Sequence, residues 1–73
     1  MFDYSKLIAR IIEKCGTRAN FAKKMGISEH SISAKLTGKT SWKQPEITLA
    51  CKILDIEYKD IPLYFFVLKV QSA

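Results

Sequence analysis

Six small or polar side chains between residues 28 and 37 have the types and spacing to recognise a surface. If residues 28–37 form a helix, Ile32 and Leu36 lie four apart on its inner face, and the remaining positions point outward. The outward set is Ser28, Glu29, His30, Ser33, Ala34 and Thr37. A glutamate accepts from cytosine N4, a histidine donates to guanine, and an alanine methyl contacts thymine. The set therefore predicts contacts with base edges in the major groove of DNA.

Two members of this outward set also have simpler interpretations. Glu29 lies in the first helical turn, where a carboxylate stabilises its own helix through the helix dipole. His30 is either a recognition residue or merely exposed, because no nucleophile or set of metal ligands accompanies it. The outward set contains no Arg, Asn or Gln for a bidentate base contact. We therefore expect modest sequence discrimination, or readout of DNA shape.

Basic and hydroxyl side chains around this stretch suit the DNA backbone. The phosphate candidates are Arg18, Lys39, Thr40, Ser41 and Lys43. The chain has a net charge of +5, and residues 17–43 carry six basic residues against one acid. A positive surface that coincides with a recognition element is typical of nucleic-acid binding, the alternative being a solvated basic face without a partner.

Two short amphipathic helices joined by a tight turn must position these side chains. Thr17 and Ser28 are typical N-caps for helices over residues 17–25 and 28–37. Gly26 can adopt the positive φ that turns the chain sharply between them. This layout is that of a helix-turn-helix.

Residues 17–38 resemble the helix-turn-helix of the phage Cro and repressor proteins, an XRE-like family. The matching residues are Phe21, Ala22, Gly26, Ile27, Ser28, Ile32, Ser33, Lys35, Leu36 and Gly38. The segments FDYSKL (2–7), PEI (45–47) and YFF (64–66) also resemble small Cro-like regulators of Gram-positive phages and prophages. Arg18 departs from the family, which often has Gln there. The resemblance implies a repressor that occupies an operator and excludes polymerase or a rival regulator.

The rest of the chain is expected to complete one domain, 1–73, which is a small all-α bundle of about five helices. Apolar spacing predicts helices over 4–15 and 44–54. A turn and a short fifth helix are expected over 55–61, interrupted by Pro62.

The start of the helix over 44–54 is unusual. Lys43 occupies the N-cap position although a lysine cannot accept a hydrogen bond there. Glu46 can still supply half of a capping box, and Trp42 with Ile47 can form a hydrophobic staple. Trp42 stacking on DNA is the alternative. We hypothesise that Lys43 replaces a better cap because it contacts phosphate.

The last stretch, LYFFVLKV (63–70), is nearly all apolar and has two interpretations. It either folds onto the core of this chain or forms a dimer interface, since so many apolar side chains are too many to leave in water. The candidate dimer residues are Tyr64, Phe65, Phe66, Val67 and Leu68.

Several classes of protein do not fit this sequence. No apolar run approaches the roughly 18 residues of a transmembrane helix, and the N-terminus is not a signal peptide. Cys15 and Cys51 fall on apolar helix faces, and two Cys with one His do not make a zinc site. We expect a cytoplasmic, nucleoid-associated protein of a bacterial host cell, with no enzymatic activity, no metal, no cofactor and no small-molecule substrate.

Two functions from different classes remain. The sequence favours a regulator that binds double-stranded operator DNA with sequence specificity, with a homodimer as one form. The alternative is a protein-interaction module of the same fold, an antirepressor or antitoxin, that grips another protein through residues 63–70. Charge placement favours DNA, whereas the lack of Arg, Asn or Gln in the outward set slightly favours the alternative.

Overall fold

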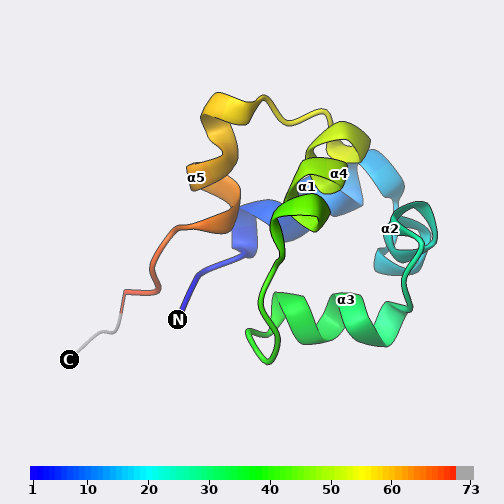
Figure 1. Cartoon of the computed structure of the whole chain (residues 1–73), viewed down its shortest axis with the longest axis horizontal. Coiled ribbons are helices and arrows are strands. Elements are labelled where there is room, and N and C mark those ends of the chain that lie inside the picture. Colours follow the sequence, from blue (N-terminus) through cyan, green and yellow to red (C-terminus); the bar gives the residue numbers. More distant parts are fainter. Residues whose placement is uncertain (71–73) are drawn as a thin grey trace.

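The computed structural model describes residues 1–70, and within that range five α-helices and one short 3₁₀ helix form a single bundle (Figure 1). The elements are α1 (Ser5–Cys15), α2 (Arg18–Met25), α3 (Glu29–Leu36), α4 (Gln44–Leu54), η1 (Tyr58–Asp60) and α5 (Ile61–Phe65). The predicted all-α class is confirmed, and the first four helices begin and end within one residue of their predicted bounds. No helix in the described range is both long and apolar enough to cross a membrane.

A fifth α-helix is present as predicted, whereas its predicted position over 55–61 and the predicted role of Pro62 were wrong. Asp55 ends α4 in a left-handed conformation with φ 55°, and the chain then forms η1. Pro62 lies in the first turn of α5 and does not interrupt a helix. The first N–H groups of a helix have no partner within it, so a proline there loses nothing and its fixed φ favours helix entry.

Two N-caps and one glycine hold α2 and α3 as predicted. The Thr17 hydroxyl accepts from the Asn20 N–H at 3.0 Å, and the Ser28 hydroxyl accepts from the Ser31 N–H at 3.1 Å. Gly26 has φ 75°, so the chain reverses there at little strain. The sequence could predict these two caps and this turn because each depends on residues only a few positions apart.

The core lies where α1, α2, α4 and α5 meet, with α3 closing one side. Its largest fully buried side chains come from every α-helix and are Phe21, Phe65, Leu7, Ile11, Ile32, Leu54 and Cys51. Cys15 and Cys51 are both buried free thiols, and burial raises the pKa of Cys51. Phe65 belongs to this core, so one part of the apolar C-terminal stretch folds inward.

The N-terminus and the end of the described chain lie side by side (Figure 1). Phe2 and Leu68 form an isolated antiparallel bridge. The Asp3 N–H donates to the Val67 carbonyl at 2.6 Å, and the Lys69 N–H donates to the Met1 carbonyl at 2.9 Å. Residues 66–69 are therefore fixed by backbone pairing more than by burial of their side chains.

Arg10 joins α1 to the end of α4. Its Nε donates to the Leu54 carbonyl and a terminal nitrogen donates to the Asp55 carbonyl, both at 2.8 Å. The other terminal nitrogen forms an ion pair with Glu13 at 2.9 Å. The carbonyls at a helix C-terminus lack partners within the helix, so this guanidinium satisfies two of them at once. Arg10 is thus a residue of the scaffold.

Replacing Arg10 by methionine keeps an apolar stem and removes these hydrogen bonds. We expect the free energy of unfolding to fall by about 1.5–3 kcal/mol, because carbonyl groups at the end of α4 lose a charged donor. Urea unfolding followed by far-UV circular dichroism measures the change.

The control is Lys14→Met on the same helix. Lys14 reaches Asp55 only at 4.0 Å and is exposed, so this change should lower stability by less than about 1 kcal/mol. Equal losses of unfolding free energy in the two variants would contradict a stabilising role for the Arg10 hydrogen bonds to the end of α4.

Candidate interaction surface

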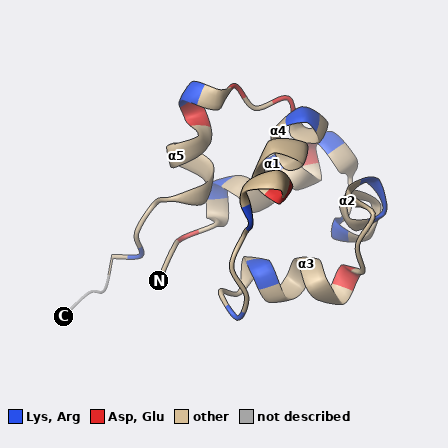
Figure 2. Ribbon diagram, viewed as in Figure 1, with Lys and Arg blue, Asp and Glu red and all other residues tan. Residues whose placement is uncertain are grey.

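Helix α3 lies along one edge of the bundle, so one side of it is free (Figures 1 and 2). Its outward set divides by exposure. Ser28, Glu29, His30 and Thr37 are exposed, whereas Ser33 and Ala34 are half-buried. The structure therefore presents all six predicted base-reading positions on α3 or at its two ends.

Two hydroxyls of this set already have partners in the helix itself. The Ser28 oxygen caps α3, and its hydroxyl also lies 3.0 Å from that of Ser31. The Thr37 hydroxyl donates to the carbonyls of Ser33 and Ala34 at 3.0 and 3.2 Å. These bonds stabilise the ends of α3 and leave Glu29 and His30 as the most available polar side chains.

The loop after α3 is held against the helix end. The N–H groups of Lys39 and Thr40 both donate to the Ala34 carbonyl, at 2.9 and 3.3 Å. The preceding Gly38 has φ 83°, which permits this return. Four of the five phosphate candidates lie on this loop and are exposed, namely Lys39, Thr40, Ser41 and Lys43. Arg18, at the start of α2, is half-buried.

A hollow of about 460 Å³ beside α3 brings members of both candidate sets together. His30 and Ala34 line it from α3, and Thr40, Ser41 and Lys43 line it from the loop. Arg18 does not line this hollow. Two of the six base-reading candidates and three of the five phosphate candidates thus lie around one hollow, whereas Lys39 and the other four base-reading candidates do not line it.

Lys35 points inward, although the sequence counted it with the positive charge of this surface. Its side chain is only 9% exposed, and its Nζ lies 2.9 Å from the Glu46 carboxylate. The same nitrogen donates to the Ser41 carbonyl at 3.2 Å and lies 5.9 Å from the centre of the Trp42 ring. Lys35 therefore ties α3 to α4 and to the loop, and is not available to a phosphate.

Glu46 receives a second hydrogen bond, from the Lys43 N–H at 2.8 Å. This is the predicted half of a capping box, and the lysine side chain cannot supply the other half. Burial alone would raise the pKa of Glu46. The Lys43 N–H together with the hydrogen bond and charge of Lys35 outweighs burial and holds the pKa below its usual value.

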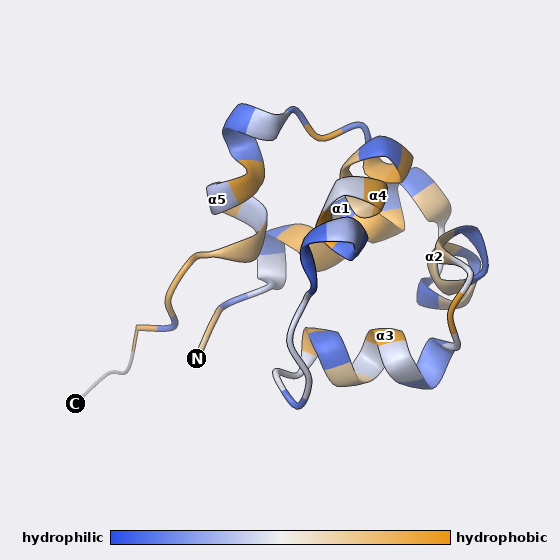
Figure 3. Ribbon diagram, in the orientation of Figure 1, coloured by the Kyte–Doolittle hydropathy of each residue, from blue (hydrophilic) through white to orange (hydrophobic). Residues whose placement is uncertain are grey.

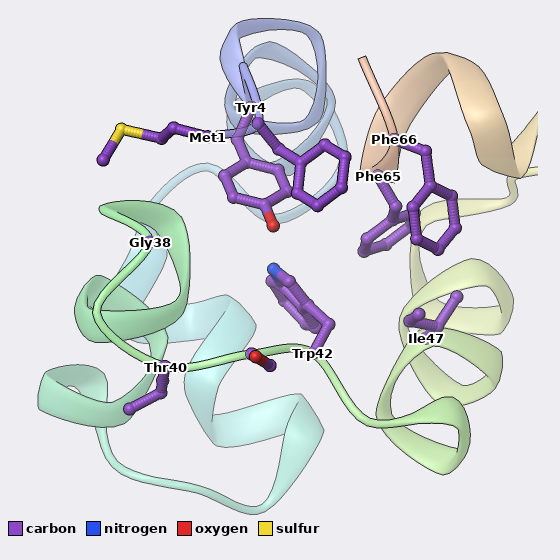
Figure 4. Close-up of a pocket in the computed structure, with 10 residues that line it drawn as sticks. Met1, Tyr4, Gly38, Thr40, Trp42, Ile47, Phe65 and Phe66 are labelled. Carbon is purple, nitrogen blue, oxygen red and sulfur yellow. The ribbon is translucent and has the colours of Figure 1, made fainter. Parts of the chain in front are cut away.

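Trp42 faces the interior, which favours packing over DNA stacking. Its ring meets Phe65 edge-on, with centroids 5.2 Å apart, and lines the same pocket as Ile47. Figure 4 shows Trp42 directed into that pocket, toward Tyr4. The predicted staple of Trp42 and Ile47 agrees with this placement.

One part of the apolar C-terminal stretch packs on the core of this chain, and another part stays exposed. Phe65 is 1% exposed and Tyr64 is half-buried, so both pack on this chain. Phe66, Val67 and Leu68 are 51%, 40% and 67% exposed. Figure 3 shows this apolar colouring continuing beyond α5. Phe66, Val67 and Leu68 thus form an exposed apolar surface next to the folded bundle.

Comparison with known proteins identifies relatives of this chain. Residues 1–67 match the family DUF739, described as "Protein of unknown function", and the chain belongs to that family. No curated protein matches the sequence. The structure is similar to the solution structure of the modulator of repression (MOR) of the temperate bacteriophage TP901-1 from Lactococcus lactis. The two share 50% identity with a TM-score of 0.81, over 96% of this chain and 95% of that chain.

These findings confirm the fold and the resemblance to small phage regulators. The chain is homologous to a small phage regulatory protein with the same all-helical fold. Neither the family nor the phage structure is described as Cro-like or XRE-like, so that assignment stays a prediction.

The charge on Glu46 gives the stability of this surface a defined pH dependence. Its lowered pKa means that the unfolded chain binds the proton more tightly, so the contribution is present above the ordinary pKa of 4.5 and is lost as pH falls below that value toward the folded pKa. We expect Glu46→Gln to remove this component, so that wild type and variant converge in unfolding free energy at acidic pH.

Denaturant unfolding at a series of pH values measures this difference. Glu57→Gln, at an exposed carboxylate paired with Lys59 at 3.5 Å, is the matched control. A difference between wild type and Glu46→Gln that stays constant from neutral to acidic pH would refute the role of this charge.

Proposed function

We propose, from its membership of this family and its homology to a phage modulator of repression, that this chain is a non-enzymatic phage regulator that modulates repression by binding another protein. The protein partner is the repressor of the phage or prophage that encodes the chain. The word modulator in the relative's name favours action on repression carried out by another molecule.

The observation that carries this proposal is the exposed apolar surface beside the paired termini. Met1, Phe66 and Leu68 are 77%, 51% and 67% exposed although the bundle is otherwise well packed. Contiguous exposed apolar side chains are typical of protein interaction sites, because water leaves them at a gain in free energy when a partner covers them.

The outward surface of α3 supports base recognition less well than the apolar surface supports protein binding. Its most available polar side chains are Glu29 and His30, and its outward set has no Arg, Asn or Gln for a bidentate contact with a base. Lys35 is occupied by Glu46. The outward side of α3 therefore has little chemistry for a sequence-specific operator contact of its own.

Duplex DNA is the second candidate ligand, favoured by the exposed lysines of the loop. Lys43 lines the hollow beside α3, Lys39 is exposed on the same loop, and loop backbone groups suit a phosphate. In this alternative the chain is a sequence-specific Cro-like repressor at the host nucleoid, acting as a homodimer on two half-sites, with binding that weakens steeply with salt.

One substitution separates the two candidates. Lys39→Glu reverses a charge on the loop at a residue that does not line the pocket of Met1 and Phe66. We expect it to change affinity for the repressor by less than about twofold while weakening any DNA binding roughly tenfold, which is about 1.4 kcal/mol. Calorimetric titration of the purified repressor and retardation of a random duplex pool measure the two affinities.

The outcomes of this comparison are distinct. A wild-type chain that enriches a two-fold symmetric DNA motif from the pool, and does not bind the repressor, would replace the protein proposal with the DNA candidate. Repressor binding that survives Lys39→Glu supports the proposal.

Lys43 tests the DNA candidate through the cap of α4. Lys43→Ser introduces a hydroxyl that can accept from the backbone of α4, so the variant should be more stable by about 0.5–2 kcal/mol. If Lys43 contacts phosphate, the same variant binds duplex DNA more weakly. Thermal unfolding and DNA titration are measured together, and an unchanged DNA affinity would remove Lys43 from the phosphate set.

A further inference from the structure

A pocket of about 380 Å³ opens between the N-terminus, the loop after α3 and α5. Aromatic rings form much of its wall, as Figure 4 shows. Phe2 meets Phe66 edge-on with centroids 5.7 Å apart, and Trp42 meets Phe65 in the same way at 5.2 Å. We call this space the aromatic pocket. Its volume lies within the range of ligand sites.

The aromatic pocket contains a buried donor that the fold does not use. The indole N–H of Trp42 is buried and has no hydrogen-bond acceptor among the described residues. Figure 4 shows the indole nitrogen and the hydroxyl of Tyr4 facing each other across the pocket. A buried donor without an acceptor costs about 1–3 kcal/mol, so a ligand that supplies an acceptor recovers that free energy.

The lining favours an apolar ligand over an anion. None of the side chains that line the pocket is charged. Burial raises the pKa of Tyr4, which keeps its hydroxyl neutral and able to donate. The rim is formed by Met1 and Phe66, which are exposed, and it continues into the exposed Leu68. The lining offers a phosphate group no cationic side chain, whereas an apolar side chain finds rings on several sides.

We infer that the aromatic pocket receives one apolar side chain of the partner repressor, with a backbone carbonyl of that partner accepting from the Trp42 indole N–H. This inference rests on the proposed function, and it assigns the site at which the partner docks. The continuous apolar rim argues for a protein segment, since such a segment covers Phe66 and Leu68 while its anchor side chain fills the pocket.

The wall of the pocket also connects it to the surface of α3. Thr40 and Ser41 line both the aromatic pocket and the hollow beside α3. Trp42 has the pocket on one side and the Lys35 ammonium 5.9 Å from its ring. A partner seated in the pocket therefore contacts the loop that carries the phosphate candidates.

The test uses the one tryptophan of the chain as its own reporter. The ¹⁵N-labelled full-length chain is titrated with the purified repressor, and the single indole N–H resonance is followed. Formation of the hydrogen bond should move this resonance downfield and slow its exchange with solvent at least several-fold. The variants Trp42→Phe and Phe66→Ser should weaken the repressor affinity roughly 3–10-fold and tenfold or more, respectively.

The matched control is Leu49→Ser on α4, because Leu49 is 39% exposed and does not line the pocket. It should leave the affinity within twofold. If Trp42→Phe does not fold, the wild-type indole resonance and Phe66→Ser still decide the question. Repressor binding that shifts other resonances but leaves the indole N–H unchanged overturns the pocket and keeps the proposed function. No binding of the repressor at all overturns both.

Discussion

The ion pair between Lys35 and Glu46 is the constraint on which the candidate surfaces depend. It joins the last turn of α3 to the first turn of α4, and the Lys35 ammonium also donates a hydrogen bond to the Ser41 carbonyl. Taking two charges out of water opposes much of their attraction, so a pair of this kind adds little net stability. Loss of Glu46 would leave the buried Lys35 ammonium without a carboxylate, and loss of Lys35 would leave the half-buried Glu46 carboxylate without a cation. Its main effect is therefore to fix the loop between the two helices in one arrangement.

With the loop fixed in this way, polar and basic side chains lie on one surface and exposed apolar side chains lie on a neighbouring one. The fixed loop places Lys43 at the hollow beside α3 and Trp42 inward against Phe65. Because Lys35 is neutralised inside, the outer surface is less positive than the sequence suggests. Apolar exposure is concentrated on the other side of the loop, around Phe66 and Leu68. This division is the reason that we propose a protein partner in preference to base reading alone.

The sequence predicted what is local and missed what is distant. Thr17, Ser28 and Gly26 act through neighbours a few residues away, so pattern and residue type were sufficient for α2 and α3. The Arg10 bonds to the end of α4 span more than forty residues, at separations of 44 and 45, and no local pattern reports them. Pro62 was misjudged because proline both stops and starts helices. The outward set lies on α3 or at its two ends and its base contacts stay a prediction, whereas the sequence counted Lys35 as surface charge because its partner lies on another helix.

The position of Trp42 links the two candidate functions physically. Its ring separates a buried ion pair from an aromatic pocket, and its chain neighbours Ser41 and Lys43 both line the hollow beside α3. Any ligand that fixes Trp42 also restricts this short loop, and any ligand that moves the loop changes the pocket. Protein and DNA would therefore not bind independently here, since both act on the segment that Lys35 holds.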